Sequence, residues 1–150
     1  MLTTILTSTS LCLHTLATIL LIGHYLLLAL VYLPALKRSV DSKALPAILA
    51  SVAGGARPYL FGSLLIFVVT GIYLMLVNDS YHGVGHFENA WSVLMLTKHL
   101  LIFVMVGLGL RLNNNLNAGG KLTDRFNSLL NAISASGLLV LLLTAFAQAQ

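Results

Sequence analysis

The chain has 150 residues, of which 58% are hydrophobic and only 8% are charged. Soluble domains carry about a quarter charged residues, so these few charges cannot cover a water-exposed surface. The composition therefore excludes a soluble globular protein and indicates an integral membrane protein. The net charge of +4 comes from a few bases that flank apolar runs, which is typical of membrane orientation and not of nucleic-acid binding.

Four apolar stretches are long enough to cross a bilayer, which takes about 20 residues of helix. They cover residues 10–33, 59–77, 91–112 and 127–147. The sequence therefore predicts an all-α polytopic membrane protein, in which a single domain (residues 1–150) forms a bundle of four transmembrane helices.

Two connecting segments carry local signals. The segment 44–55 is expected to form a short helix on the membrane surface that ends at the Gly54-Gly55 pair. The segment 113–120 is rich in Asn and Gly and is expected to be a turn. In the fourth span, Ser134, Ser136 and Gly137 form a small-residue face suited to close helix packing.

The basic residues predict how the chain lies in the membrane. All Lys and Arg residues except Lys98 fall in or beside the segments 36–58 and 111–126. We expect the protein to lie in the cell (inner) membrane, and the positive-inside rule then places both segments on its cytoplasmic side. Both termini and the loop 78–90 are expected to be extracytoplasmic.

None of the spans contains Asp or Glu, so their histidines are the candidate metal-ligating residues. His14 and His24 lie on one half of the first helix, about 15 Å apart in depth. His99 lies about 12 Å from the outer end of the third span, between those two depths. Two imidazoles that face each other across a bundle suit the axial positions of b-type haem.

The pairing is not the only interpretation of these residues. We expect His14 and His99 to ligate the iron, with His24 as the substitute ligand or as part of a second site. The alternative is a neutral histidine that bonds a nearby threonine or carbonyl. Lys98 would neutralise a haem propionate, or would extend to the outer interface beside Trp91.

The outer loop offers a different metal chemistry. His82 and His86 are four residues apart, and Glu88 follows, so a loop that converges could bind copper. Copper transport or resistance is therefore the first alternative to haem binding. The spans contain no Met-rich ladder for Cu(I), which favours haem over copper. A cofactor-free structural subunit of a membrane assembly is the second alternative.

A family resemblance is carried by four short motifs. They are LH at 13–14, YLP at 32–34, TGIY at 70–73, and Trp91 followed by Lys98. Over its first three spans the chain resembles the CopD-like superfamily, which includes copper-resistance D domains and the HemJ-type protoporphyrinogen oxidases. The resemblance implies four-span units, with His14 as the first-span histidine, a haem ligand in the HemJ-type branch.

The same resemblance implies that Lys98 is the third-span lysine and Arg57 the second-span arginine. We expect Lys98 and Arg57 to be partners for propionate or lipid phosphate. Ala35 stands where the oxidase branch has the arginine of YLPR, so a haem-b or metal-handling subunit is favoured over that oxidase. Whether the chain is an enzyme is left open. We expect a membrane-embedded b-type haem protein in electron transfer, either alone or as the anchor of a larger respiratory or photosynthetic redox complex in the lipid bilayer.

Overall fold

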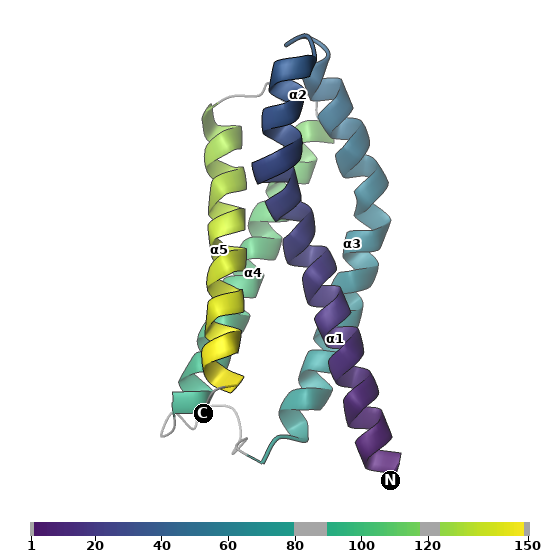
Figure 1. Cartoon of the computed structure of the whole chain (residues 1–150), viewed down its shortest axis with the longest axis vertical. Helices are drawn as coiled ribbons and strands as arrows, with labels where there is room; N and C mark the ends of the chain where they lie inside the picture. Colours follow the sequence, from purple (N-terminus) through teal and green to yellow (C-terminus); the bar gives the residue numbers. More distant parts are fainter. Residues whose placement is uncertain (1, 80–89, 118–123, 149–150) are drawn as a thin grey trace.

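The computed structural model describes residues 2–79, 90–117 and 124–148, and every regular element among them is helical. The elements are α1 (Leu2–Leu27), the π-helical turn η1 (Leu28–Tyr32), α2 (Leu33–Ser39), α3 (Leu45–Leu76), α4 (Ala90–Asn117) and α5 (Asp124–Gln148) (Figure 1). Four continuous helical stretches among the described residues are long and apolar enough to cross a membrane: Leu2–Ser39, Leu45–Leu76, Val93–Leu116 and Phe126–Phe146. The predicted all-α, four-span architecture is confirmed.

The first helical stretch is longer than the predicted span 10–33, and a widened turn interrupts it. In η1 the backbone N–H of Leu33 donates to the oxygen of Leu28, five residues earlier. Pro34 follows directly and has no N–H, and its ring would collide with the carbonyl of Leu30 in a regular α-helix. The π-helical turn displaces that carbonyl, so the chain stays helical through Pro34.

The expected surface helix over 44–55 is wrong, because α3 runs unbroken from Leu45 through Gly54, Gly55 and Pro58. Glycine in a helix interior costs only about 1 kcal/mol relative to alanine. In a membrane the alternative to a helix is unpaired backbone groups, each of which costs several kcal/mol. Continuing the helix is therefore the less costly solution for this segment.

The expected turn over 113–120 is also wrong in its first part. Helix α4 includes residues 113–117, and residues 118–123 lie outside the described part of the chain. Asparagine is a weak helix former, but a helix that is already nucleated adds each further residue at little cost. The fourth span agrees closely with α5.

The helices are arranged as two tightly packed pairs. Helix α1 packs most extensively against α3, and α4 packs most extensively against α5. Contacts between the pairs, α3 with α4 and α1 with α5, are fewer, and α1 and α4 lie diagonally across the bundle. The pairs converge at the end that carries α2 and diverge at the other end, where both chain termini lie (Figure 1).

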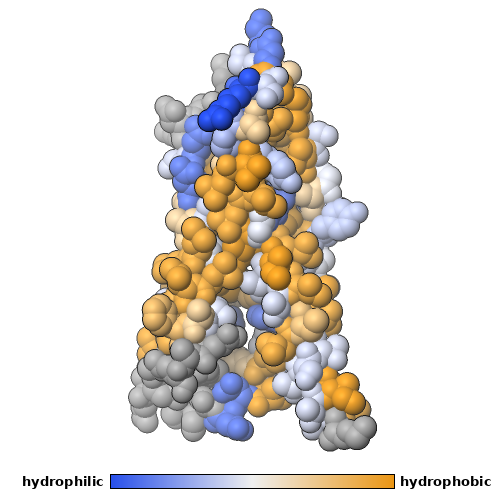
Figure 2. All heavy atoms as spheres, in the orientation of Figure 1, coloured by the Kyte–Doolittle hydropathy of each residue, from blue (hydrophilic) through white to orange (hydrophobic). Residues whose placement is uncertain are grey.

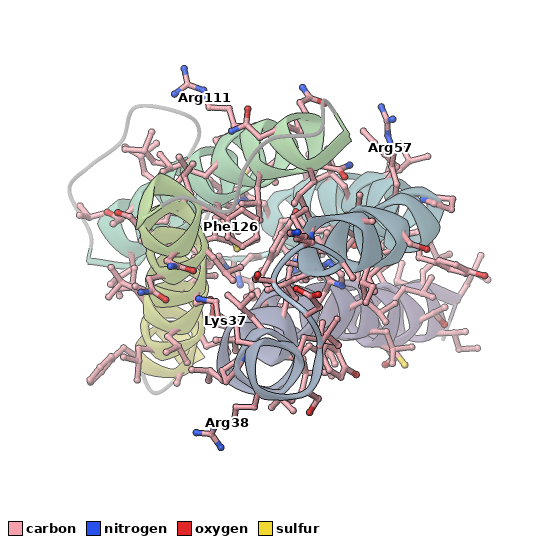
Figure 3. The ribbon with its side chains drawn as sticks, turned by 90° about the horizontal axis from the view of Figure 1, so that it is seen from above. Lys37, Arg38, Arg57, Arg111 and Phe126 are labelled. Atoms are coloured by element: carbon pink, nitrogen blue, oxygen red, sulfur yellow. The ribbon has the colours of Figure 1, made fainter. Side chains whose placement is uncertain are left out.

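We call these the basic end and the terminal end. The basic end carries Lys37, Arg38, Lys43, Arg57 and Arg111, and hydrophilic residues gather there over α2 (Figure 2). Seen from that end, Arg38, Arg57 and Arg111 point away from the bundle, whereas Phe126 lies among the helices (Figure 3). Lys37 instead donates to Oδ1 of Asn127 at 3.1 Å and so links α2 to α5.

Large apolar side chains cover the outside of the bundle. Leu30, Tyr59, Leu65, Phe103 and Phe146 are each about two-thirds exposed or more. Figure 2 shows this apolar surface between the two ends. Such a surface is stable only in contact with lipid, which supports a membrane environment.

Small residues of α5 allow the two pairs to meet. A Cβ added to Gly137 would lie 2.9 Å from Cγ2 of Ile22 on α1 and 3.5 Å from Sδ of Met105 on α4. Ser134 is buried beside it and donates to the backbone oxygen of Tyr25 at 3.4 Å. The predicted small-residue face therefore packs through Ser134 and Gly137, whereas Ser136 bonds within α5, to Ala132.

Candidate functional site

His14 is held on α1 by three residues of α3. Its Nδ1 lies 3.1 Å from the oxygen of Phe67 and 3.0 Å from Oγ1 of Thr70. Its ring also stacks on that of Phe67, with 4.3 Å between centroids and 26° between planes. A Cβ on Gly71 would lie 3.0 Å from Cε1 of His14, so the glycine leaves room for the imidazole.

These bonds determine which ring nitrogen carries the proton. A carbonyl oxygen can only accept, so Nδ1 of His14 donates to Phe67. The hydroxyl of Thr70 donates to the oxygen of Ile66 at 2.6 Å and can therefore accept from the same Nδ1–H. The lone pair of the neutral imidazole then lies on Nε2, which makes no hydrogen bond to a described residue.

His99 on α4 has the same tautomer by the same argument. Its Nδ1 donates to the backbone oxygen of Met95, one turn earlier on the helix, at 2.6 Å. Its Nε2 is likewise without a hydrogen bond in the described part of the chain. A histidine that donates Nδ1–H to a carbonyl is oriented and made more basic at Nε2, as in protein metal sites.

The fold brings His14, Lys98 and His99 into one neighbourhood. His14 interacts electrostatically with both Lys98 and His99, although they come from the diagonally opposed helix α4. All three side chains are half-buried. They lie in the half of the bundle where the pairs diverge, and a space-filling view shows an opening between the pairs there (Figure 2). Lys98 forms no hydrogen bond or ion pair with any described residue.

The other two sequence-predicted residues lie apart from this neighbourhood. His24 is half-buried on α1, where its only ring contact within the described chain is the edge of Tyr25, 5.1 Å between centroids. Arg57 is at the basic end, with its guanidinium carbon 5.7 Å from the centroid of the Phe61 ring. Neither residue joins His14 and His99.

The proposed copper ligands belong to the segment that connects α3 to α4. His82 and His86 lie outside the described residues. Among the residues that the structure does describe, no three His, Cys, Asp or Glu side chains gather where they could hold a metal ion. Any metal bound between His14 and His99 would need its remaining ligands from another source.

Sequence reasoning missed the residues that position His14. Phe67, Thr70 and Gly71 are ordinary members of an apolar span, and they are more than 50 residues from His14 along the chain. The one signal was the Thr-Gly pair inside the apolar run, since glycine is tolerated there where another group approaches closely. It does not reveal which group approaches.

Both interpretations of the histidines are compatible with the hydrogen bonds of His14 and His99. Each ring does bond a threonine or a carbonyl through Nδ1. His14 bonds Phe67 and Thr70, and His99 bonds Met95. No described residue bonds Nε2 of either ring, so the two interpretations are compatible with each other. No family model, curated protein or solved structure matches this chain.

Proposed function

We propose that this chain is a membrane-embedded b-type haem-binding protein that acts in electron transfer, alone or as the membrane subunit of a larger redox complex. The observation that carries the proposal is the pair His14 and His99. The two rings come from opposed helices, each is fixed through Nδ1–H, and the Nε2 of each bonds to no described residue. A low-spin haem takes one axial nitrogen on each side of its iron.

The donor chemistry around the rings fits such a group. Stacking on Phe67 fixes the ring plane of His14, and the bonds to Phe67 and Met95 hold Nε2 as the basic nitrogen. Haem supplies one-electron chemistry when it is bound. Lys98 would then be the counter-ion of a propionate, because its half-buried ammonium pairs with no described carboxylate and an unpaired charge is costly in a membrane.

Orientation and location belong to the same proposal. The bases of the basic end make that end cytoplasmic by the positive-inside rule. The terminal end and the His14–His99 neighbourhood then lie towards the outside of a cell membrane. The resemblance to the CopD-like superfamily supports the haem proposal, since it implies that His14 is the family's first-span histidine.

The deciding experiment is the visible difference spectrum of the purified chain, dithionite-reduced minus oxidised, with haem counted per polypeptide. We expect an α-band in the b-type region that is lost in both His14→Ala and His99→Ala. His24→Ala is the matched control, because His24 is a half-buried α1 histidine outside the pair, and it should keep the band. Elemental analysis of the same sample measures copper.

Each contrary result favours a specific alternative. A protein that carries copper and has no haem band would replace haem with copper handling, through His82 and His86 or through the pair. The folded chain could instead purify with neither metal nor haem and gain no band when haem is added. That result would favour the cofactor-free structural subunit. A band that survives both alanine variants would refute the ligand assignment.

A further inference from the structure

A groove lies near the basic end, away from the His14–His99 neighbourhood. It is formed by α1, α3 and α4, and its empty volume is about 430 Å³ with its open side included. Its lining includes Tyr25 of α1, Arg57, Phe61 and Leu64 of α3, and Met105 and Asn113 of α4. Most of the lining surface is apolar.

The polar and apolar residues of the groove lie at opposite ends. Helices α3 and α4 run antiparallel, so Arg57 and Asn113 share the level nearer the basic end (Figure 1). Leu64 and Met105 share the deeper level, about 10 Å further along the helix axes. The groove therefore has the polarity of an amphiphile, with a polar head towards the basic end and an apolar tail towards mid-membrane.

Two polar groups at the upper level lack partners in the described chain. The Arg57 guanidinium contacts the Phe61 ring but pairs with no described carboxylate, and it points outward at the edge of the bundle (Figure 3). Oδ1 of Asn113 is buried and accepts no hydrogen bond from a described residue. A buried acceptor left without a donor costs about 1–3 kcal/mol, so a bound donor would relieve it.

These two groups require different chemistry from one ligand. A guanidinium binds a phosphate through two parallel N–H bonds. The amide oxygen of Asn113 needs an O–H or N–H donor. An apolar chain is needed to fill the space beside Leu64 and Met105. The surrounding bases of the basic end attract an anion to the same level.

We propose that this groove binds one anionic glycerophospholipid whose headgroup carries free hydroxyls, as phosphatidylglycerol does. Its phosphate pairs with Arg57, a headgroup hydroxyl donates to Asn113, and one acyl chain lies along Leu64 and Met105. The site is independent of haem binding.

The test is a lipid titration of the full chain after delipidation in detergent, read by native mass spectrometry. Three lipids with the same acyl chains are compared: phosphatidylglycerol, phosphatidylethanolamine and phosphatidic acid. We expect the first complex with phosphatidylglycerol to form at least about 10-fold more tightly than the one with phosphatidylethanolamine. Both lipids offer a phosphate to Arg57, so the difference comes from the ammonium of phosphatidylethanolamine, which would lie beside Arg57 and the other bases of the basic end and be repelled by them.

Matched variants separate the site from general charge. Arg57→Gln should remove most of the preference for phosphatidylglycerol, whereas Arg111→Gln, at an exposed arginine outside the groove, should leave it unchanged. Asn113→Leu should abolish only the preference for phosphatidylglycerol over phosphatidic acid, which lacks the glycerol headgroup and its alcohol hydroxyls. Its control is Asn114→Leu at the exposed neighbour.

A last pair tests the acyl chain. Leu64→Trp fills the groove and should prevent the tight complex, whereas Leu65→Trp on the exposed face of α3 should not. Equal binding of all three lipids, or equal losses in Arg57→Gln and Arg111→Gln, would overturn the proposal. Competition by inorganic phosphate as effective as that by lipid would show an anion site without a lipid groove. Arg57→Gln keeps the test decisive if Leu64→Trp does not fold.

Discussion

At the scale of single residues, His14 and His99 share one hydrogen-bonding arrangement and one tautomer. Each uses Nδ1–H to bond a backbone oxygen, and Nε2 of each makes no hydrogen bond within the part of the chain that the structure describes. The sequence predicted which histidines share a depth, because depth follows from residue count along a helix. It could not predict the anchors of His14, because rotation of one helix against another depends on side-chain packing.

Removing the second acceptor of His14 tests how firmly the ring is held. Thr70→Val keeps the shape of the side chain but deletes the Oγ1 that lies 3.0 Å from Nδ1 of His14. We expect the free energy of unfolding in detergent to fall by about 0.5–1.5 kcal/mol, which is the usual contribution of one hydrogen bond. Thr15→Val is the control, because the exposed Thr15 hydroxyl bonds only within its own helix, to Leu11. Equal losses in the two variants would show that the bond from His14 to Thr70 adds no stability.

Lys98 provides a residue-scale test of the haem proposal. Lys98→Met preserves an unbranched chain of similar length and deletes its positive charge. A reduced haem carries one more negative charge than an oxidised one, so losing a nearby cation lowers the reduction potential. A unit charge about 10 Å away at an effective dielectric of about 20 corresponds to tens of millivolts. Redox titration measures this shift, and Lys37→Met at the remote basic end should show none.

At the scale of elements, the errors of sequence reading share one cause. Gly54-Gly55 and the Asn-rich 113–117 are turn signals in water, where an interrupted backbone can bond to solvent. Each lies inside a helix here, because a membrane chain satisfies its backbone groups best by remaining helical. Pro34 shows the adjustment that this requires, since a π-helical turn precedes it.

The contact of α5 with α1 can be tested with two glycines. Gly137→Ala places a methyl group 2.9 Å from Cγ2 of Ile22, a β-branched residue that moves little, so we expect a loss of about 1–3 kcal/mol. Gly107→Ala places the same methyl group in open space and should be neutral or stabilising by up to about 1 kcal/mol. Denaturant unfolding of both variants measures this difference. A stabilised Gly137→Ala variant would contradict the close approach.

At the scale of the whole molecule, hydropathy alone accounts for most of the architecture. Four apolar stretches predicted four spans, because a bilayer requires length and apolarity whatever the order of residues within a span. The pairing of α1 with α3 and of α4 with α5 is a tertiary result that spacing does not reveal. The bond of Ser134 to Tyr25, 109 residues apart, illustrates such a contact.

The predicted orientation can be measured with single cysteines. In a Cys12→Ser background, Thr3→Cys marks the terminal end and Ser39→Cys marks the basic end, and both positions are exposed. We expect a membrane-impermeant maleimide to label Thr3→Cys in intact bacterial cells, and to label Ser39→Cys only after permeabilisation. The positive-inside rule is the physical basis of this expectation. The opposite labelling pattern would contradict the predicted orientation and place the basic end outside the cell.

The arrangement in two pairs also bears on how the molecule is assembled. The partners within each pair, α1 with α3 and α4 with α5, are neighbours along the chain, so each pair is a helical hairpin that can form as it enters the membrane. His14 belongs to the first hairpin and His99 to the second. Their meeting place is therefore completed last, when two finished hairpins dock. A ligand held by both histidines would contribute its binding free energy to that docking step.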